Sequence, residues 1–238
     1  MMTSPSSGKD PADRAQDDVG VLGNERLTAL TGAVLLVLFA VETVTVILLR
    51  GLMPAHFFVG VLLIGPVAVK TASTGWRFLR YYARHPAYRR KGPPRHAMRV
   101  LSPLLLVSTL AVIGSGIALA ATGPAPELLL RIHVISFLAW LVLIIIHVSV
   151  YASRLPRAIA EDWWRRRTNR DGTRTGRRAR LAANVAALVA AAIPALVLVP
   201  AAAPWTGYVE QAVSGFGVLA VVAIAITAVV AAVRQRLR

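Results

Sequence analysis

The chain has 238 residues, of which 56% are hydrophobic and 16% charged, yet its formal net charge is +16. This composition is too apolar for an ordinary soluble domain, and the absence of cysteine excludes disulfides, thiolate catalysis and cysteine-ligated iron–sulfur clusters. The arginines border apolar runs, so we interpret them as topology signals and contacts with anionic lipid, and not as a nucleic-acid site.

Residues 1–25 are polar and rich in Ser, Pro, Gly and Asp, which predicts a disordered tail without the features of a secretory signal. Six apolar runs of roughly 20 residues follow, each long enough to cross about 30 Å of hydrocarbon. They are Leu27–Leu49, His56–Trp76, Val100–Ala121, Leu128–Tyr151, Leu181–Ala201 and Val213–Val233. Helices satisfy every backbone polar group inside such spans, so the sequence predicts an all-α bundle of six transmembrane helices.

The connections after the second and fourth runs are strongly basic. The positive-inside rule therefore predicts that both connections and both termini lie in the cytoplasm. Trp76 falls where an inner aromatic belt is expected, and Trp205 and Tyr208 fall where an outer belt is expected. The abundance of Ala and Arg is typical of GC-rich bacterial genomes, so we expect a multi-pass protein of a bacterial cytoplasmic membrane.

The distribution of polar residues divides the chain into four parts. We expect a cytoplasmic tail (1–25), a four-helix membrane domain (26–152), a basic cytoplasmic loop (153–180) and a two-helix C-terminal membrane segment (181–238). The last two apolar runs carry prolines but no histidine. We interpret them as a packing pair or a docking surface, because they offer no group for chemistry.

Two histidines share the fourth apolar run, and their spacing is informative. His133 and His147 are fourteen residues apart, which places them about 40° apart around a helix and about 21 Å apart along it. In the second run, His56 and Lys70 have the same spacing. Both runs are expected to cross the membrane from outside to inside, so His56 should match His133 in depth, and Lys70 should match His147.

Two imidazoles from neighbouring helices can ligate a six-coordinate b-type haem without any cysteine. His56 and His133 are the candidate pair. Gly60 lies one turn after His56 on the same face, where it would let a porphyrin approach the backbone. Gly114 and Gly116 could make similar room in the third run.

This pattern resembles the bacterial cytochrome b-561-like and hydrogenase b-subunit superfamily over residues 27–151. The resemblance implies a haem b between antiparallel helices, and electron transfer between quinols and partner redox proteins. It implies that His56 and His133 are an outer ligand pair and that His147 is an inner ligand. Lys70 stands where a second inner histidine would be expected, so the resemblance supports one haem and puts a second in doubt.

The histidines also have simpler interpretations. His133 and His147 could be hydrogen-bonded bundle residues, and His56 could face solvent. Lys70 could extend to the interface, pair with a haem propionate or a quinone carbonyl, or, least in keeping with its charge, ligate iron.

Other ionisable residues are candidates for supporting roles. Arg131 lies at the outer end of its run, where it could pair with a haem propionate. Glu42 lies inside the first run, where it could relay protons or be hydrogen-bonded for structural reasons. His85 and His96 lie in a basic connection and are expected to be solvated.

The sequence therefore favours a membrane b-type cytochrome that passes electrons between a quinone pool and a partner redox protein. It leaves open whether the chain is the haem-binding subunit of a membrane oxidoreductase. The alternatives are a non-redox transporter or scaffold subunit, and a cytochrome fold that has lost its haem. Phosphate-binding loops and hydrolase motifs are absent from the sequence.

Overall fold

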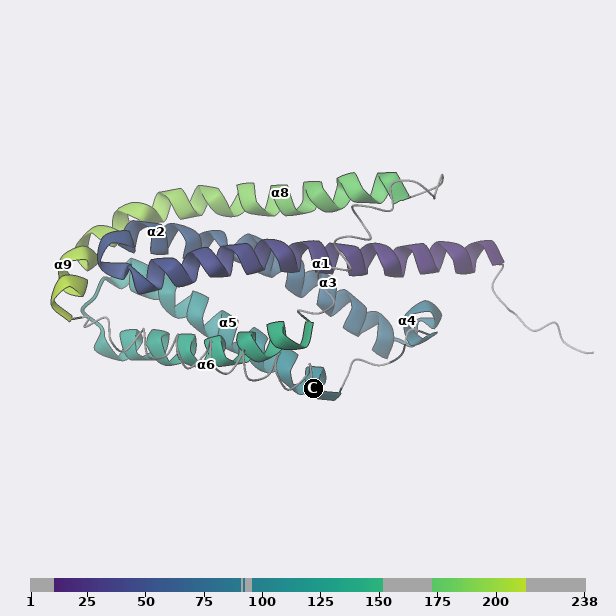
Figure 1. Cartoon of the computed structure of the whole chain (residues 1–238), viewed down its shortest axis with the longest axis horizontal. Coiled ribbons are helices and arrows are strands. Elements are labelled where there is room, and N and C mark those ends of the chain that lie inside the picture. Colours follow the sequence, from purple (N-terminus) through teal and green to yellow (C-terminus); the bar gives the residue numbers. More distant parts are fainter. Residues whose placement is uncertain (1–10, 91, 93–95, 152–172, 213–238) are drawn as a thin grey trace, which may run out of the picture.

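The computed structural model describes residues 11–90, 92, 96–151 and 173–212 (Figure 1). Every regular element in these residues is a helix, which confirms the predicted all-α class. The elements are α1 (Pro11–Ile47), α2 (Leu49–Leu62), α3 (Ile64–Tyr82), α4 (Pro86–Arg90), α5 (His96–Thr122), α6 (Glu127–Tyr151), α8 (Thr173–Leu198), the 3₁₀-helix η1 (Val199–Ala202) and α9 (Ala203–Ala212).

Five stretches of helix are long and apolar enough to cross a membrane. They are Val19–Ile47, Leu49–Tyr82, Met98–Thr122, Glu127–Ser149 and Gly176–Val209. These stretches correspond to the first five predicted spans. The sixth predicted span, residues 213–233, and the basic connection as far as residue 172 lie outside the described residues. At most 28% of the most apolar window of each stretch is buried, as expected for a bundle whose outer surface meets lipid.

The first helix begins earlier than the sequence suggested. Residues 11–25, which we expected to be disordered, form the first part of α1. Pro11 occupies the first turn, where its missing N–H costs no helical hydrogen bond. Val21 is buried against Ala87 and Tyr88 of α4. This contact with residues distant in the sequence stabilises a segment whose composition alone predicts no structure.

The second span is divided into α2 and α3 by a break at Leu63. Pro66 has no N–H to donate to the carbonyl of Leu62, and its ring would crowd that carbonyl in a regular helix. The break is slight, because Leu63 keeps right-handed helical dihedral angles. The two helices therefore cross the apolar layer as one span.

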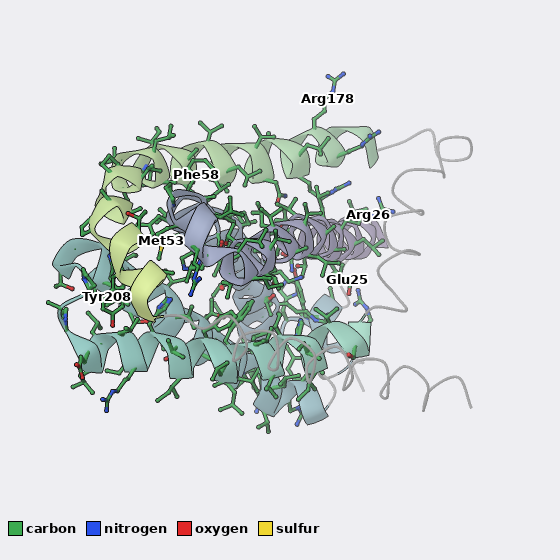
Figure 2. The ribbon with its side chains drawn as sticks, turned by 60° about the vertical axis from the view of Figure 1, so that its left-hand side comes forward. Glu25, Arg26, Met53, Phe58, Arg178 and Tyr208 are labelled. Carbon is green, nitrogen blue, oxygen red and sulfur yellow. The ribbon has the colours of Figure 1, made fainter. Side chains whose placement is uncertain are left out.

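The helices pack in two groups. In Figure 1, α1 lies beside α2 and α3. The helix α8 also packs mainly against α2 and α3. The helices α5 and α6 form a hairpin and pack mainly against each other. We call the end of the bundle that carries α9 the α9 end, and the opposite end the α4 end. Figure 2 shows Met53 and Tyr208 at the α9 end, with Glu25, Arg26 and Arg178 toward the α4 end.

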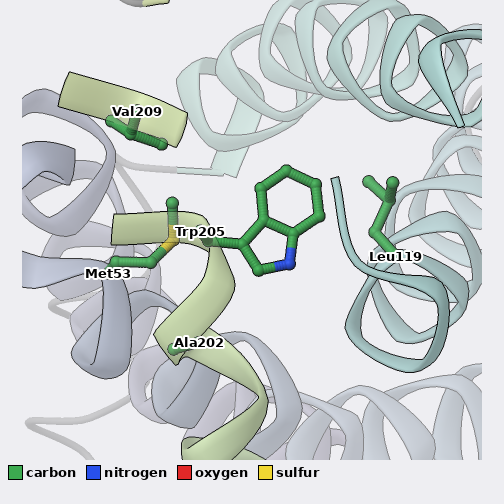
Figure 3. Close-up of a cluster of buried hydrophobic side chains, with 5 residues drawn as sticks. All are labelled: Met53, Leu119, Ala202, Trp205 and Val209. Carbon is green, nitrogen blue, oxygen red and sulfur yellow. The ribbon is translucent and has the colours of Figure 1, made fainter. Parts of the chain in front are cut away.

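A buried apolar cluster joins the two groups at the α9 end (Figure 3). It consists of Met53, Leu119, Ala202, Trp205 and Val209. Trp205, which we expected in an outer aromatic belt, is only 4% exposed and lies inside this cluster. The belt pattern predicts the depth of an aromatic residue but not the direction in which its helix turns it. The C-terminal segment is therefore packed onto the four-helix part at this end.

A row of hydrogen bonds joins α1 to α3 toward the α4 end. Asn24 donates from its amide to the carbonyl of Ser73 at 3.0 Å, and the Thr28 hydroxyl lies 3.0 Å from the Ser73 hydroxyl. Glu25 and Arg77 form an ion pair at 3.7 Å in the next turn. These contacts fix the rotation of this part of α1 against α3.

Candidate functional site

His56 of α2 and His133 of α6 lie together near the α9 end of the bundle. Their ring centres are 6.5 Å apart, and the ring planes are inclined by 80°. The two residues are 77 positions apart in the sequence and belong to helices from different groups. The structure thus brings together the pair that the fourteen-residue spacing indicated.

The His56 ring is held by a carboxylate from α1. His56 Nδ1 lies 2.8 Å from Glu42 Oε1. The Thr45 hydroxyl lies 3.0 Å from the second carboxylate oxygen and 2.7 Å from the backbone carbonyl oxygen of Glu42. Thr45 Oγ1 is also 3.4 Å from His56 Nδ1. A carboxylate can only accept, so the proton of a neutral His56 ring belongs on Nδ1. That tautomer leaves a lone pair on Nε2.

The His133 ring is held by neutral groups from α5. His133 Nδ1 is 3.1 Å from the Val112 carbonyl oxygen and 3.0 Å from Ser115 Oγ. The carbonyl can only accept, so a neutral His133 ring also carries its proton on Nδ1. Among the described residues, every hydrogen bond of His56 and His133 uses Nδ1 and none uses Nε2. Both nitrogens suited to a metal therefore remain available.

These two imidazoles would be able to hold the iron of a haem through their Nε2 atoms. Ligating histidines usually donate their second N–H to a carboxylate or a carbonyl, which fixes the ring. Imidazoles that share one metal ion each place a nitrogen about 2 Å from it, so their rings must lie close together. The ring centres of His56 and His133, 6.5 Å apart, are close enough for the two residues to share a metal ion. The described residues contain no group of three or more His, Cys, Asp or Glu side chains placed to hold a metal ion.

The glycines near the pair have different roles from those expected. A methyl group at Gly116 would lie 3.1 Å from His133 Cε1, so Gly116 makes room for the imidazole itself. Gly60 faces Glu42, because a methyl group there would lie 3.4 Å from Glu42 Oε1. Gly114 has no atom within 4 Å of such a methyl group and faces open space. Gly116 thus lies against the His133 ring, and Gly60 lies beside the Glu42 carboxylate that holds His56.

Lys70 of α3 and His147 of α6 form a second polar level. Lys70 Nζ donates to the carbonyl oxygen of Thr28 in α1 at 2.6 Å, and Gly32 leaves room for the ammonium group. Lys70 and His147 each lie fourteen residues beyond a member of the histidine pair, about 21 Å along helices that run in the same direction. The contact that Lys70 makes is with the backbone of α1.

An aromatic layer separates the two polar levels. Trp140 is seven residues from both His133 and His147, which is about 10 Å along the helix in each direction. Its Nε1 donates to Thr109 Oγ1 at 3.0 Å, and its ring meets Phe39 edge-on with centres 4.7 Å apart. Packed side chains from three helices thus lie between the histidine pair and the Lys70 level.

Arg131 is not brought to the histidine pair. Its side chain is 74% exposed and forms an ion pair with Glu127, one turn earlier on α6, at 3.4 Å. His85 lies at the α4 end, where its ring centre is 5.7 Å from that of Tyr88. Neither residue contacts the His56 or His133 rings.

Three site residues carried too little sequence signal to be assigned. Glu42 was visible as a carboxylate within an apolar run, but nothing in the sequence pointed to His56 as its partner. Thr45 and Ser115 are hydroxyl residues of a kind common in membrane helices, where they often bond to their own backbone. Their contacts depend on how α1 and α5 are rotated about their axes.

No family model matches the chain, and no curated protein or solved structure is significantly similar to it.

Proposed function

We propose that this protein is a b-type membrane cytochrome that holds one haem b between His56 and His133. The observation that carries the proposal is the pair of imidazoles 6.5 Å apart, each anchored through Nδ1 by a different neighbouring helix. A bound haem would supply a one-electron redox centre. The chain itself would bind the iron through two Nε2 atoms, orient both rings and exclude water with the aromatic layer.

The proposed role is electron transfer between a quinone pool and a partner redox protein. The resemblance to membrane cytochromes b supports it, as does the placement of the ring pair inside helices apolar enough to cross a membrane. We further propose a bacterial cytoplasmic membrane, with the basic α4 end and both termini in the cytoplasm. His147 and Lys70 would then lie nearer the cytoplasmic side than the haem.

The test is optical. The protein is purified in detergent from cells supplied with ample haem, and a dithionite-reduced minus oxidised spectrum is recorded with a pyridine haemochrome count. We expect a b-type spectrum with one haem per chain. His56→Ala and His133→Ala should each abolish it, because each removes an axial ligand.

The controls separate ligation from general damage. His85→Ala, at the far end of the bundle, should keep the full spectrum, and His147→Ala should keep it if there is a single haem. A haem count of two that falls to one in His147→Ala would add a second centre at the Lys70 level. A colourless wild-type protein would overturn the proposal and favour a non-redox transporter or scaffold.

A further inference from the structure

The two histidines of the pair are anchored by groups of different charge. His56 Nδ1 faces a carboxylate, Glu42, at 2.8 Å. His133 Nδ1 faces two neutral acceptors, Ser115 Oγ and the Val112 carbonyl oxygen. An ionised acceptor forms a hydrogen bond roughly twice as strong as a neutral one. His56 therefore faces a carboxylate, whereas His133 faces neutral groups.

Glu42 is held as a fixed part of this arrangement. Its side chain is 14% exposed, within a helix apolar enough to span a membrane. Oε1 faces His56, and Oε2 lies 3.0 Å from the Thr45 hydroxyl. Gly60 of α2 lies beside the carboxylate, since a methyl group there would be 3.4 Å from Oε1. Burying a carboxylate in this environment costs free energy unless the group is paired, and His56 is its partner here. An ionisable residue within a membrane span is a candidate for a functional role.

We propose that Glu42 is a positioning residue that sets the reduction potential of the haem through His56. This inference rests on the proposed function. A carboxylate that accepts the Nδ1–H hydrogen bond makes the imidazole a stronger electron donor, and its charge would favour the ferric over the ferrous iron of a bound haem. Glu42 thus keeps the potential lower than the neutral anchors of His133 would.

The experiment is a potentiometric titration of the full chain in detergent, followed at the haem absorption band. Glu42→Gln keeps the shape and one acceptor oxygen but removes the charge. We expect it to favour the reduced form at least tenfold relative to wild type, a rise in midpoint potential of about 59 mV for one electron. Thr45→Val keeps the charge of Glu42 but removes the hydroxyl that lies against its carboxylate. The carboxylate is then less firmly oriented, so the midpoint potential should rise by a smaller amount.

Ser115→Ala is the matched control on the other ligand. It removes a neutral anchor, while the Val112 carbonyl still accepts from His133, so the potential should change much less than in Glu42→Gln. A haem-bearing Glu42→Gln protein whose shift is no larger than that of Ser115→Ala overturns the inference and leaves the proposed function intact. If Glu42→Gln assembles without haem, Thr45→Val decides: a raised potential supports the inference and an unchanged one overturns it. A wild-type protein without haem overturns both proposals.

Discussion

At the residue scale, each imidazole of the pair is held by a helix other than its own. Glu42 of α1 holds His56 of α2, and Ser115 of α5 holds His133 of α6. Each anchor is therefore formed only when two helices have their correct rotation. The orientation of the rings consequently depends on the assembly of the whole bundle.

Gly116→Ala is expected to disturb the His133 ring. The added methyl group would lie 3.1 Å from Cε1 and 3.6 Å from Nδ1, so the ring must shift by a few tenths of an ångström, which strains its contact with Ser115. We expect lower haem occupancy and a loss of stability of about 1–3 kcal/mol, typical of overpacking, partly offset by about 1 kcal/mol of helix propensity. Haem content and thermal unfolding in detergent measure the two effects.

Gly114→Ala is the matched control, two residues earlier on the same helix. Its methyl group meets no atom within 4 Å, so it gains the same helix propensity without a steric clash. We expect full haem occupancy and unchanged or raised stability. Equal haem content and equal stability in the two variants would contradict the close packing of Gly116 against His133.

At the element scale, α3 and α8 approach each other closely at Gly65. A methyl group on Gly65 would lie 2.8 Å from the Ala187 carbonyl carbon and 3.1 Å from Ala191 Cβ. Helices in lipid gain no hydrophobic free energy from associating, so close packing of small residues supplies much of the attraction. Gly65 is therefore a main contact between the C-terminal span and the four-helix part.

Gly65→Ala is expected to separate α3 from α8. The obstacle is the backbone of Ala187, which cannot rotate away as a flexible side chain could. We expect a loss of at least about 1–3 kcal/mol in the free energy of unfolding. Gly75→Ala, on the same helix with no atom within 4 Å, should be neutral or stabilising. Chemical unfolding in detergent compares them, and similar midpoints would argue against this interface.

The sequence predicted the spans well because hydropathy and length alone decide whether a helix can cross a membrane. It did not predict the helical start of α1, because residues 11–25 are polar and their order depends on contacts such as Val21 with Tyr88. It also placed Trp205 at the correct end of its span but not inside the apolar cluster. Depth follows from counting residues along a helix, whereas rotation depends on the neighbouring helices.

The same distinction explains what could be predicted of the site. The fourteen-residue spacing gave the depth of His56 and His133 correctly, because both spans run in the same direction. It could not identify Glu42 as the partner of His56, since that contact depends on the rotation of α1. The suggested role of Arg131 rested on depth alone, and its side chain instead points outward beside Glu127.

In the molecule as a whole, basic residues and the histidine pair lie toward opposite ends of the bundle. The described basic residues from the end of α3 through α4, including Arg77, Arg84 and Arg89, lie at the α4 end. The histidine pair and the buried cluster around Trp205 lie toward the α9 end. If the positive-inside rule holds, the proposed haem lies nearer the outer face of the membrane. An electron entering from the cytoplasmic side would then have to pass the Lys70 level and the aromatic layer.

This orientation can be tested directly, because the chain has no cysteine to give a background signal. Ala83, after α3, and Ala125, between α5 and α6, are exposed alanines at opposite ends of the bundle. Each is replaced by cysteine, and right-side-out vesicles are treated with a maleimide that cannot cross the membrane. We expect Ala125→Cys to react at once and Ala83→Cys to react only after detergent is added. The reverse pattern would show the opposite orientation in the membrane, with the histidine pair nearer the cytoplasmic side. Immediate reaction at both sites would show that the two alanine positions do not lie on opposite faces of the membrane.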